Sequence, residues 1–208
     1  MAAGPLVILS ETRTETVVNR SRFIGLARPA GDAAAAEDAM TKIRLAFPDA
    51  SHHCFAWRAG PGHERLSDDG EPQGTAGAPL LESLRRAKIE FGVVAVVRYY
   101  GGRKLGRAGL YRAYLGAARS ALTKAELAER IFGHSYRVRL AHQRHPAFLG
   151  ALAAVQGEVI ETAWGEAVEI TYWLPDDEQA SSALGAQLAE TAAATLLGPE
   201  MRHRARAP

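Results

Sequence analysis

The segment Val93-Val94-Ala95-Val96-Val97-Arg98-Tyr99-Tyr100-Gly101-Gly102 passes from an unbroken apolar run into a basic, glycine-rich turn. The apolar run is rich in β-branched residues, which is typical of a strand that is buried on both faces. After the turn, apolar side chains recur at steps of three and four from Leu110 to Leu122, and this spacing predicts a helix with one buried face. A buried strand followed by an amphipathic helix indicates a fold that mixes α and β structure.

Upstream of this segment, the sequence predicts strands and two helices. Asp32 is the expected N-cap of the first helix, and Pro48 follows its expected end, while Pro79 lies in the first turn of the second. Residues 59–75 are dense in turn-forming residues, so we expect a loop there. The expected elements are strands at Leu6–Leu9, Thr14–Asn19, Arg22–Leu26 and His52–Arg58, and a helix that follows Asp32 and runs through Ala46.

Downstream, the pattern starts again near residues 128–134 and predicts a second domain. Its elements follow the βαββαβ order of ferredoxin-like domains. We therefore predict an α+β protein with two domains, at 1–131 and 132–199, and a basic tail at 200–208 that is frayed from Met201 onward. The expected elements are strand Tyr136–Leu140, helix Pro146–Val155, strands Val159–Trp164 and Ala167–Leu174, helix Asp176–Ala193 and strand Thr195–Leu197.

The composition is that of an ordinary globular protein. Of the 208 residues, 47% are hydrophobic and 23% are charged, and the net charge is +2, so a nucleic-acid site would have to come from local clustering of charge. Cys54 is the only cysteine, which excludes a disulfide framework and a cysteine-rich metal site. No apolar stretch approaches the roughly 20 residues of a membrane span. We therefore expect a cytoplasmic protein with no membrane association and no cofactor.

Basic residues concentrate between Arg98 and Ala125, where the sequence has no acidic residue. Glycines let backbone N–H groups approach a ligand closely, and the start of the following helix presents unpaired donors, so phosphate is the ligand that suits this turn. The alternative is that the glycines only shape the turn and the cations are solvated. Neither a P-loop nor a dinucleotide-binding glycine motif is present. The candidate phosphate-binding residues are Arg98, Gly101, Gly102, Arg103, Lys104, Gly106, Arg107, Gly109 and Arg112.

Several groups of residues in the first domain resemble motifs of the YigZ/IMPACT family, in the order of that family. The resemblance implies a first domain with the fold of domain 2 of ribosomal protein S5, a ferredoxin-like second domain, and an association with translational control. The residues that carry it are Ser21–Ile24, His52–Cys54, Ser67–Pro72 with Gly74–Gly77, Arg98–Gly102, Lys104–Gly106 and Arg112–Tyr114.

An acidic loop and its neighbours form a second candidate site. The carboxylates could hold a divalent cation or supply a general base, or the loop could be a turn whose acids pair with the basic segment. No metal-binding spacing is present, so we favour the turn and expect no metal. The candidate residues are His53, Ser67, Asp68, Asp69, Glu71 and Thr75.

Neighbouring residues on a strand point to opposite faces of its sheet. His52 and His53 therefore do not share a metal, and Cys54 is poorly placed to act as a nucleophile. Tyr100 or Tyr111 could stack a base, as in proteins that bind single-stranded RNA. The tryptophans are expected in hydrophobic cores, and they are Trp57, Trp164 and Trp173.

The favoured interpretation is a non-enzymatic protein that binds RNA or the ribosome through the basic turn and acts in translation, while the second domain binds a protein partner or extends the binding surface. Two other interpretations stay open. One is a metal-dependent enzyme that acts on a phosphorylated substrate, with Asp68, Asp69 and Glu71 on the metal. The other is a protein-interaction module whose basic face binds an acidic partner.

Overall fold

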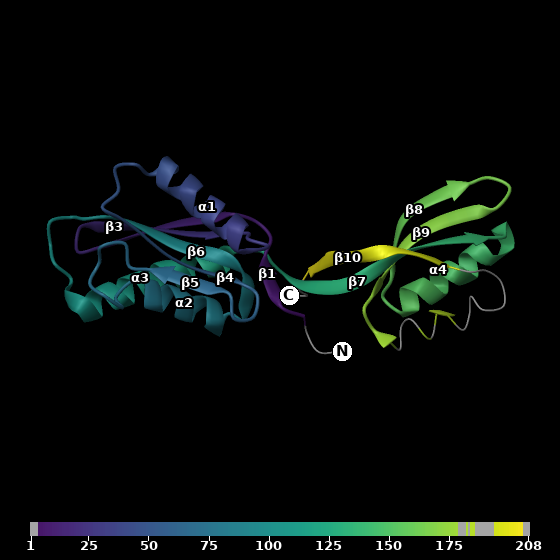
Figure 1. Cartoon of the computed structure of the whole chain (residues 1–208). Helices are drawn as coiled ribbons and strands as arrows, with labels where there is room; N and C mark the ends of the chain where they lie inside the picture. Colours follow the sequence, from purple (N-terminus) through teal and green to yellow (C-terminus); the bar gives the residue numbers. More distant parts are fainter. Residues whose placement is uncertain (1–3, 179–181, 183, 186–193, 206–208) are drawn as a thin grey trace. The chain divides into compact units, whose positions relative to one another are not determined.

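Figure 1 shows the computed structural model of the chain, which describes residues 4–178, 182, 184–185 and 194–205. Helices and strands are both present, so the predicted α+β class is confirmed. The chain forms two compact units, one that extends through Glu129 and includes Ala205, and one from Arg130 to Arg204. Within the described residues, no helix is both long and apolar enough to cross a membrane.

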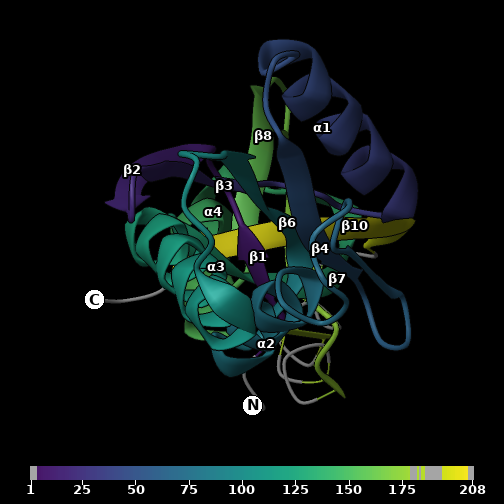
Figure 2. The same ribbon diagram turned by 90° about the vertical axis from the view of Figure 1, so that its left-hand side faces the viewer.

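The first unit is a sheet that carries helices on both faces, as Figures 1 and 2 show. In chain order its elements are β1 (Leu6–Ile8), β2 (Thr12–Val18), β3 (Ser21–Arg28), α1 (Ala33–Ala46), β4 (His52–Ala59), β5 (Glu64–Ser67), α2 (Gly77–Arg86), β6 (Ile89–Tyr99), α3 (Gly106–Lys124) and the first residues of β7 (Leu127–Leu140).

The long strand β6 organises this sheet. β4 pairs antiparallel with one of its edges, while β3 pairs antiparallel and β1 parallel with the other. β2 extends the sheet beyond β3, β5 extends it beyond β4, and the start of β7 pairs with β1. Asp32 caps α1 as predicted, because its carboxylate accepts the N–H of Ala35 at 2.7 Å.

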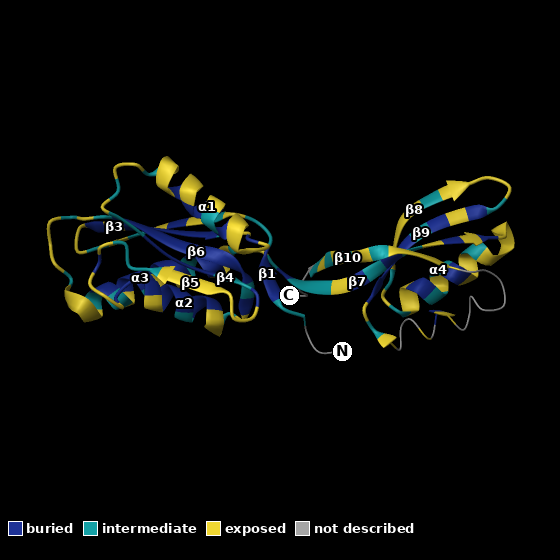
Figure 3. Ribbon diagram, in the orientation of Figure 1, coloured by how far each residue is buried: buried dark blue, intermediate teal, exposed yellow. Residues whose placement is uncertain are grey.

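The two-residue period of β6 assigns its side chains to the two faces of the sheet. Val93, Ala95 and Val97 pack with α1, whereas Val94 and Val96 pack with α2 and α3. Figure 3 shows β6 as buried and the outer surfaces of the helices as exposed. By the same alternation Arg98 lies on the face of α2 and α3. His52 is the residue opposite Arg98 on β4, so the two side chains reach the same region of the first unit.

The second unit has a four-element sheet path in the order β10, β7, β9, β8. β7 and β8 both run antiparallel to β9, so the strands expected at Val159–Trp164 and Ala167–Leu174 are antiparallel neighbours. This order is that of a ferredoxin-like sheet. The predicted helix Asp176–Ala193 lies largely outside the described residues. The elements after β7 are a 3-10 turn (His142–Arg144), α4 (His145–Ala154), β8 (Glu158–Trp164), β9 (Val168–Pro175) and β10 (Thr195–Ala205).

One expected loop and one expected tail contain strands instead. β5 lies within residues 59–75, as an edge strand that pairs with β4 and has mostly exposed side chains. The frayed tail was a wrong prediction, because β10 continues through Ala205. Trp173 donates from its indole Nε1 to the carbonyl oxygen of Glu200 at 3.1 Å, and Arg202 pairs with Glu158 at 3.0 Å. These distant partners, rather than a local apolar pattern, hold the strand.

Two further boundaries and one burial prediction were also wrong. β7 begins at Leu127, not at Tyr136, because its first residues pair with β1. α3 begins at Gly106, so the last glycines of the basic turn belong to the helix. Trp57 and Trp173 are buried as expected, but Trp164 is 64% exposed. It ends β8, an edge strand of which most residues are exposed.

Candidate functional site

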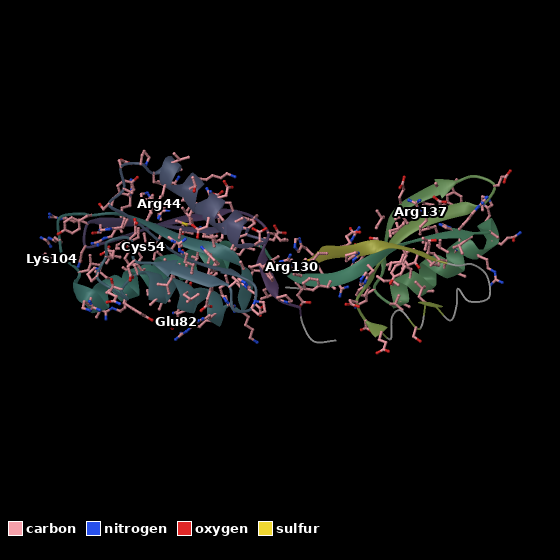
Figure 4. All side chains as sticks on the ribbon, viewed as in Figure 1. Arg44, Cys54, Glu82, Lys104, Arg130 and Arg137 are labelled. Carbon is pink, nitrogen blue, oxygen red and sulfur yellow. The ribbon has the colours of Figure 1, made fainter. Side chains whose placement is uncertain are left out.

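A hollow of about 510 Å³ lies beside the start of α3 in the first unit. β4, β6, α3, the turn between β6 and α3, and the loop between β5 and α2 supply its lining. Figure 4 shows Lys104 at the end of the first unit where α3 begins, and Cys54 in the interior. The polar residues of the lining are His52, Glu71, Arg98, Lys104 and Arg107.

Arg98 and Glu71 form a buried ion pair at the base of this hollow. Their side chains are 5% and 4% exposed, and the guanidinium Nη1 lies 2.5 Å from Glu71 Oε1. Arg98 also donates from Nη2 to the hydroxyl of Ser21 at 3.2 Å. Tyr114 donates from its hydroxyl to Glu71 Oε1 at 2.7 Å. Arg98 was predicted to contact phosphate. In the structure Glu71 compensates its charge, and its side chain forms part of the floor of the hollow.

Cys54 is connected to this ion pair through Tyr114. Its sulfur lies 3.4 Å from the hydroxyl oxygen of Tyr114 and 3.0 Å from the carbonyl oxygen of Asp68. Burial raises the pKa of the Cys54 thiol and also raises the pKa of the Tyr114 phenol. Both groups therefore stay neutral near pH 7. A buried neutral thiol is not a nucleophile, which agrees with the prediction for Cys54.

Asp68 organises the loop that leads into α2. Its Oδ2 accepts the N–H of Gly74 at 2.8 Å, and its Oδ1 accepts those of Ala76 and Gly77 at 2.9 and 2.8 Å. Burial alone would raise the pKa of Asp68, but the N–H groups of Gly74, Gly77 and Ala76 outweigh it and hold the pKa below its usual value. Asp68 thus binds the backbone of its own loop, as the turn interpretation predicts.

The remaining residues of the acidic loop are also bound to the protein. Asp69 accepts the backbone N–H of His53 at 2.7 Å, and its own N–H donates to the hydroxyl of Ser67 at 3.1 Å. Thr75 donates from its hydroxyl to the carbonyl oxygen of Pro72 at 2.6 Å. Among the described residues, no group of three or more His, Cys, Asp or Glu side chains converges as metal ligands would.

The two histidines take different places. The Nε2 atom of His53 lies 2.9 Å from the carbonyl oxygen of Phe47, and His53 does not line the hollow. His52 lies 2.8 Å from the carbonyl oxygen of Asp69 through Nδ1. Because a carbonyl only accepts, Nδ1 of His52 is the donor in this contact. Nε2 of His52 lies 3.8 Å from Glu71 Oε1.

The backbone of the basic turn itself requires or favours glycine at several positions. A Cβ on Gly101 would lie 2.1 Å from the backbone carbonyl of Arg20, so only glycine fits against that segment. Gly102 and Gly106 have φ values of +79° and +71°, which favour glycine. Leu105 is the N-cap of α3 and makes no side-chain capping bond. The first N–H groups of α3 therefore have no side-chain acceptor from the cap position.

The cations around the start of α3 differ from most others in the chain. Arg103, Lys104, Arg107 and Arg112 are exposed, and none forms an ion pair with a carboxylate of the described residues. Many other cations have acidic partners, as Lys42 has in Asp38 at 2.7 Å, although Arg119 and Lys124 farther along α3 also form no ion pair within the described residues. Arg107 donates to the carbonyl oxygen of Gln73 at 2.7 Å, which orients its side chain toward the loop.

The structure brings together only part of the predicted set. The hollow collects Arg98, Lys104, Gly106, Arg107 and Glu71. Thr75 and Arg112 line a second hollow of about 340 Å³ that Arg107 also borders, and Gly109 lines a third together with Arg112. Sequence reasoning missed His52, Leu105 and Leu110 as lining residues. The period of two in β4 carried a signal for His52, because it lies two residues from the buried Cys54.

The family model described as the Impact N-terminal domain matches residues 19–122, a range that contains the whole hollow. A protein of Escherichia coli strain K12, described as IMPACT family member YigZ, is 32% identical over 177 residues that cover 83% of this chain and 84% of that protein. The chain belongs to the IMPACT family.

Two further comparisons extend the IMPACT assignment. An IMPACT family member of Thermus thermophilus, described as lying in the pol 5′ region, is 38% identical over 160 residues, with 76% of this chain and 87% of that protein covered. A crystal structure of a hypothetical protein matches 94% of this chain and 98% of its own length, with a TM-score of 0.63 and 28% identity. A solved structure of another protein is therefore similar to this IMPACT chain over nearly its full length.

Proposed function

We propose that this IMPACT family protein is a non-enzymatic RNA-binding protein and that RNA phosphates bind at the start of α3. The observation that carries the proposal is the set of exposed cations there that have no carboxylate partner among the described residues, Arg103, Lys104, Arg107 and Arg112. Unpaired cations beside the donors of a helix N-terminus favour phosphate oxygens.

The carboxylates of this region favour binding over metal-dependent catalysis. Asp68 is occupied by three backbone N–H groups, and Glu71 compensates Arg98. Neither arrangement leaves a set of oxygen ligands directed at one point, as a catalytic divalent cation would require.

The role in translation, on RNA or on the ribosome, rests on the family resemblance. We propose that the second unit contacts a protein partner. The exposed edge strand β8 is the surface that supports this proposed contact.

The test is the salt dependence of RNA binding. A short single-stranded RNA is titrated with the protein between about 50 and 200 mM salt, and affinity is followed by fluorescence anisotropy. The double substitution Lys104→Ala and Arg107→Ala should weaken binding and reduce the salt slope by about 1.4, which is roughly 0.7 for each phosphate of a single strand that the variant no longer neutralises. The melting temperature should barely change, because exposed charges in a turn contribute little to folding.

The matched control removes the same charge from the other end of the same helix. Arg119 and Lys124 are exposed and lie outside the hollow, and Arg119 is about 18 Å along the helix axis from Arg107. Arg119→Ala with Lys124→Ala should leave the slope close to that of the unchanged protein. If both double variants reduce the slope equally, the protein has a diffuse positive field and no site at the start of α3.

A further inference from the structure

We propose that the hollow takes one unpaired nucleotide of a single-stranded RNA, with the base against Tyr100 and the phosphate at the start of α3. This inference rests on the proposed function and adds to it the form of RNA that is recognised and the groups that recognise it.

The size and lining of the hollow do not suit phosphate alone. Its volume of about 510 Å³ falls within the roughly 300–1,000 Å³ typical of pockets for small organic ligands. Pro72, Tyr100, Leu105 and Leu110 line it together with the cations. A phosphate ion has no favourable contact with such side chains, whereas a flat base does. A ligand that joins an aromatic ring to a phosphate uses both halves of the lining.

Tyr100 is placed as a stacking surface. Its side chain is 48% exposed although it borders the hollow. The guanidinium carbon of Arg98 lies 5.3 Å from the ring centroid, and the backbone N–H of Tyr100 donates to the hydroxyl of Ser51 at 3.0 Å. The ring is thus held by a buried cation and an anchored backbone while part of its surface is open. Stacking of a base on such a ring contributes to binding whatever the base.

The charged half of the lining lies where the phosphate of that nucleotide would be. Lys104 and Arg107 border the same hollow as Tyr100, beside the uncapped first turn of α3. Arg98 provides an independent sign of a polar ligand. It is buried at the floor, and its Nε has no hydrogen-bond partner among the described residues. The floor therefore keeps one N–H donor that the protein itself does not use.

This arrangement selects unpaired RNA. A base in a duplex is stacked on its neighbours and paired along its edge, so it cannot enter a hollow without being extruded. A base in a single strand or a loop is already free to stack on an aromatic side chain. The expected ligand is therefore a single-stranded segment that binds through its phosphates and inserts one base.

The test compares two strands that carry the same phosphates. One is a short single-stranded RNA, and the other is a strand of equal length in which every base is absent from the ribose. The intact protein should bind the base-bearing strand about 5- to 150-fold more tightly, the range expected for one stacked base. Tyr100→Ala should remove that preference. Tyr100→Phe should keep it, because the ring is retained.

Phe132→Ala is the matched control. Phe132 is also an exposed aromatic residue, at 54%, and it too has an arginine two residues earlier near its ring, at 5.9 Å. This variant should keep the full preference. If both strands bind equally to the unchanged protein with a steep salt slope, the inserted base is excluded but phosphate binding stands. If a free nucleoside monophosphate binds as tightly as the strand, the ligand is a mononucleotide and the inference is overturned. If neither strand binds, the proposed function itself is wrong.

Discussion

Glu71 pairs with Arg98 in the interior of the first unit, and this is the most deeply buried ion pair among the described residues. Removing one partner of a buried ion pair leaves the other charge without compensation. Glu71→Gln should therefore lower the free energy of unfolding by about 3–5 kcal/mol, measured by urea denaturation. Glu15→Gln is the control, because Glu15 is exposed and pairs with Arg22 at 3.7 Å. Its effect should stay below about 1 kcal/mol.

A second change separates the effect of charge compensation from that of packing. When Arg98→Met is added to Glu71→Gln, the uncompensated cation disappears, so part of the stability should return. A double variant that is less stable than Glu71→Gln alone would show that Arg98 contributes mainly through its contacts with Phe23 and Tyr100, whose ring centroids each lie 5.3 Å from its guanidinium carbon.

Gly101 and Gly116 should respond in opposite ways to alanine. At Gly101 a Cβ would lie 2.1 Å from the backbone of Arg20, which cannot move aside as a side-chain tip can. Gly101→Ala should cost more than about 2 kcal/mol of stability, as overpacking does. Gly116 lies within α3, and a Cβ there meets nothing within 4 Å. Gly116→Ala should stabilise the protein by about 0.5–1 kcal/mol through helix propensity. Thermal denaturation of both variants checks the pair, and a loss of stability at Gly116 would contradict the helical assignment.

At the scale of elements, Asp68 connects the acidic loop to the start of α2. Asp68→Ala removes the acceptor of three backbone N–H groups, so stability near pH 7 should fall by about 1–3 kcal/mol. Because the pKa of Asp68 is lowered in the folded protein, its contribution is complete above the unfolded-state value of about 3.9 and is lost as the pH falls through the folded value.

The difference in stability between the unchanged protein and Asp68→Ala should therefore be constant from neutral pH to about pH 5 and should shrink below about pH 4. Denaturation curves at several pH values measure it. Asp38→Ala, which breaks an exposed pair with Lys42, should show at most a small and nearly pH-independent difference. A gap for Asp68→Ala that widens in acid would contradict the role of the ionised carboxylate.

The elements that the sequence predicted well are those whose signal is local. β3 and β4 were found because each is a run of mostly apolar residues between polar breaks, and α1 because an N-cap precedes it. β5 and the end of β10 were missed, because exposed edge strands have no apolar period and depend on partners elsewhere in the chain. The same limit applies to the site. The exposed cations were evident from spacing, but the burial of Arg98 depends on Glu71, which is 27 residues away along the chain.

At the scale of the whole molecule, the two units have separate hydrophobic cores. Ile24, Met40 and Leu80 belong to cores of the first unit, and Phe148 and Ile170 belong to that of the second. Every residue that lines the hollow lies in the first unit. The phosphate contacts and the inserted base are therefore both properties of one unit, and the salt slope should belong to that unit as well.

A fragment that ends after residue 131 tests this assignment. It keeps Leu127–Glu129 of β7, which pair with β1, so it should unfold cooperatively and bind single-stranded RNA with the slope of the full chain. Lys104→Ala with Arg107→Ala should reduce the slope of the fragment by the same amount as in the full chain, because distant and independent contacts add. A complementary fragment from Arg130 onward should not reproduce this slope. If the first fragment folds but binds with a smaller slope, the second unit also neutralises phosphates, and its basic strand β10, which contains Arg202 and Arg204, would be the next place to substitute.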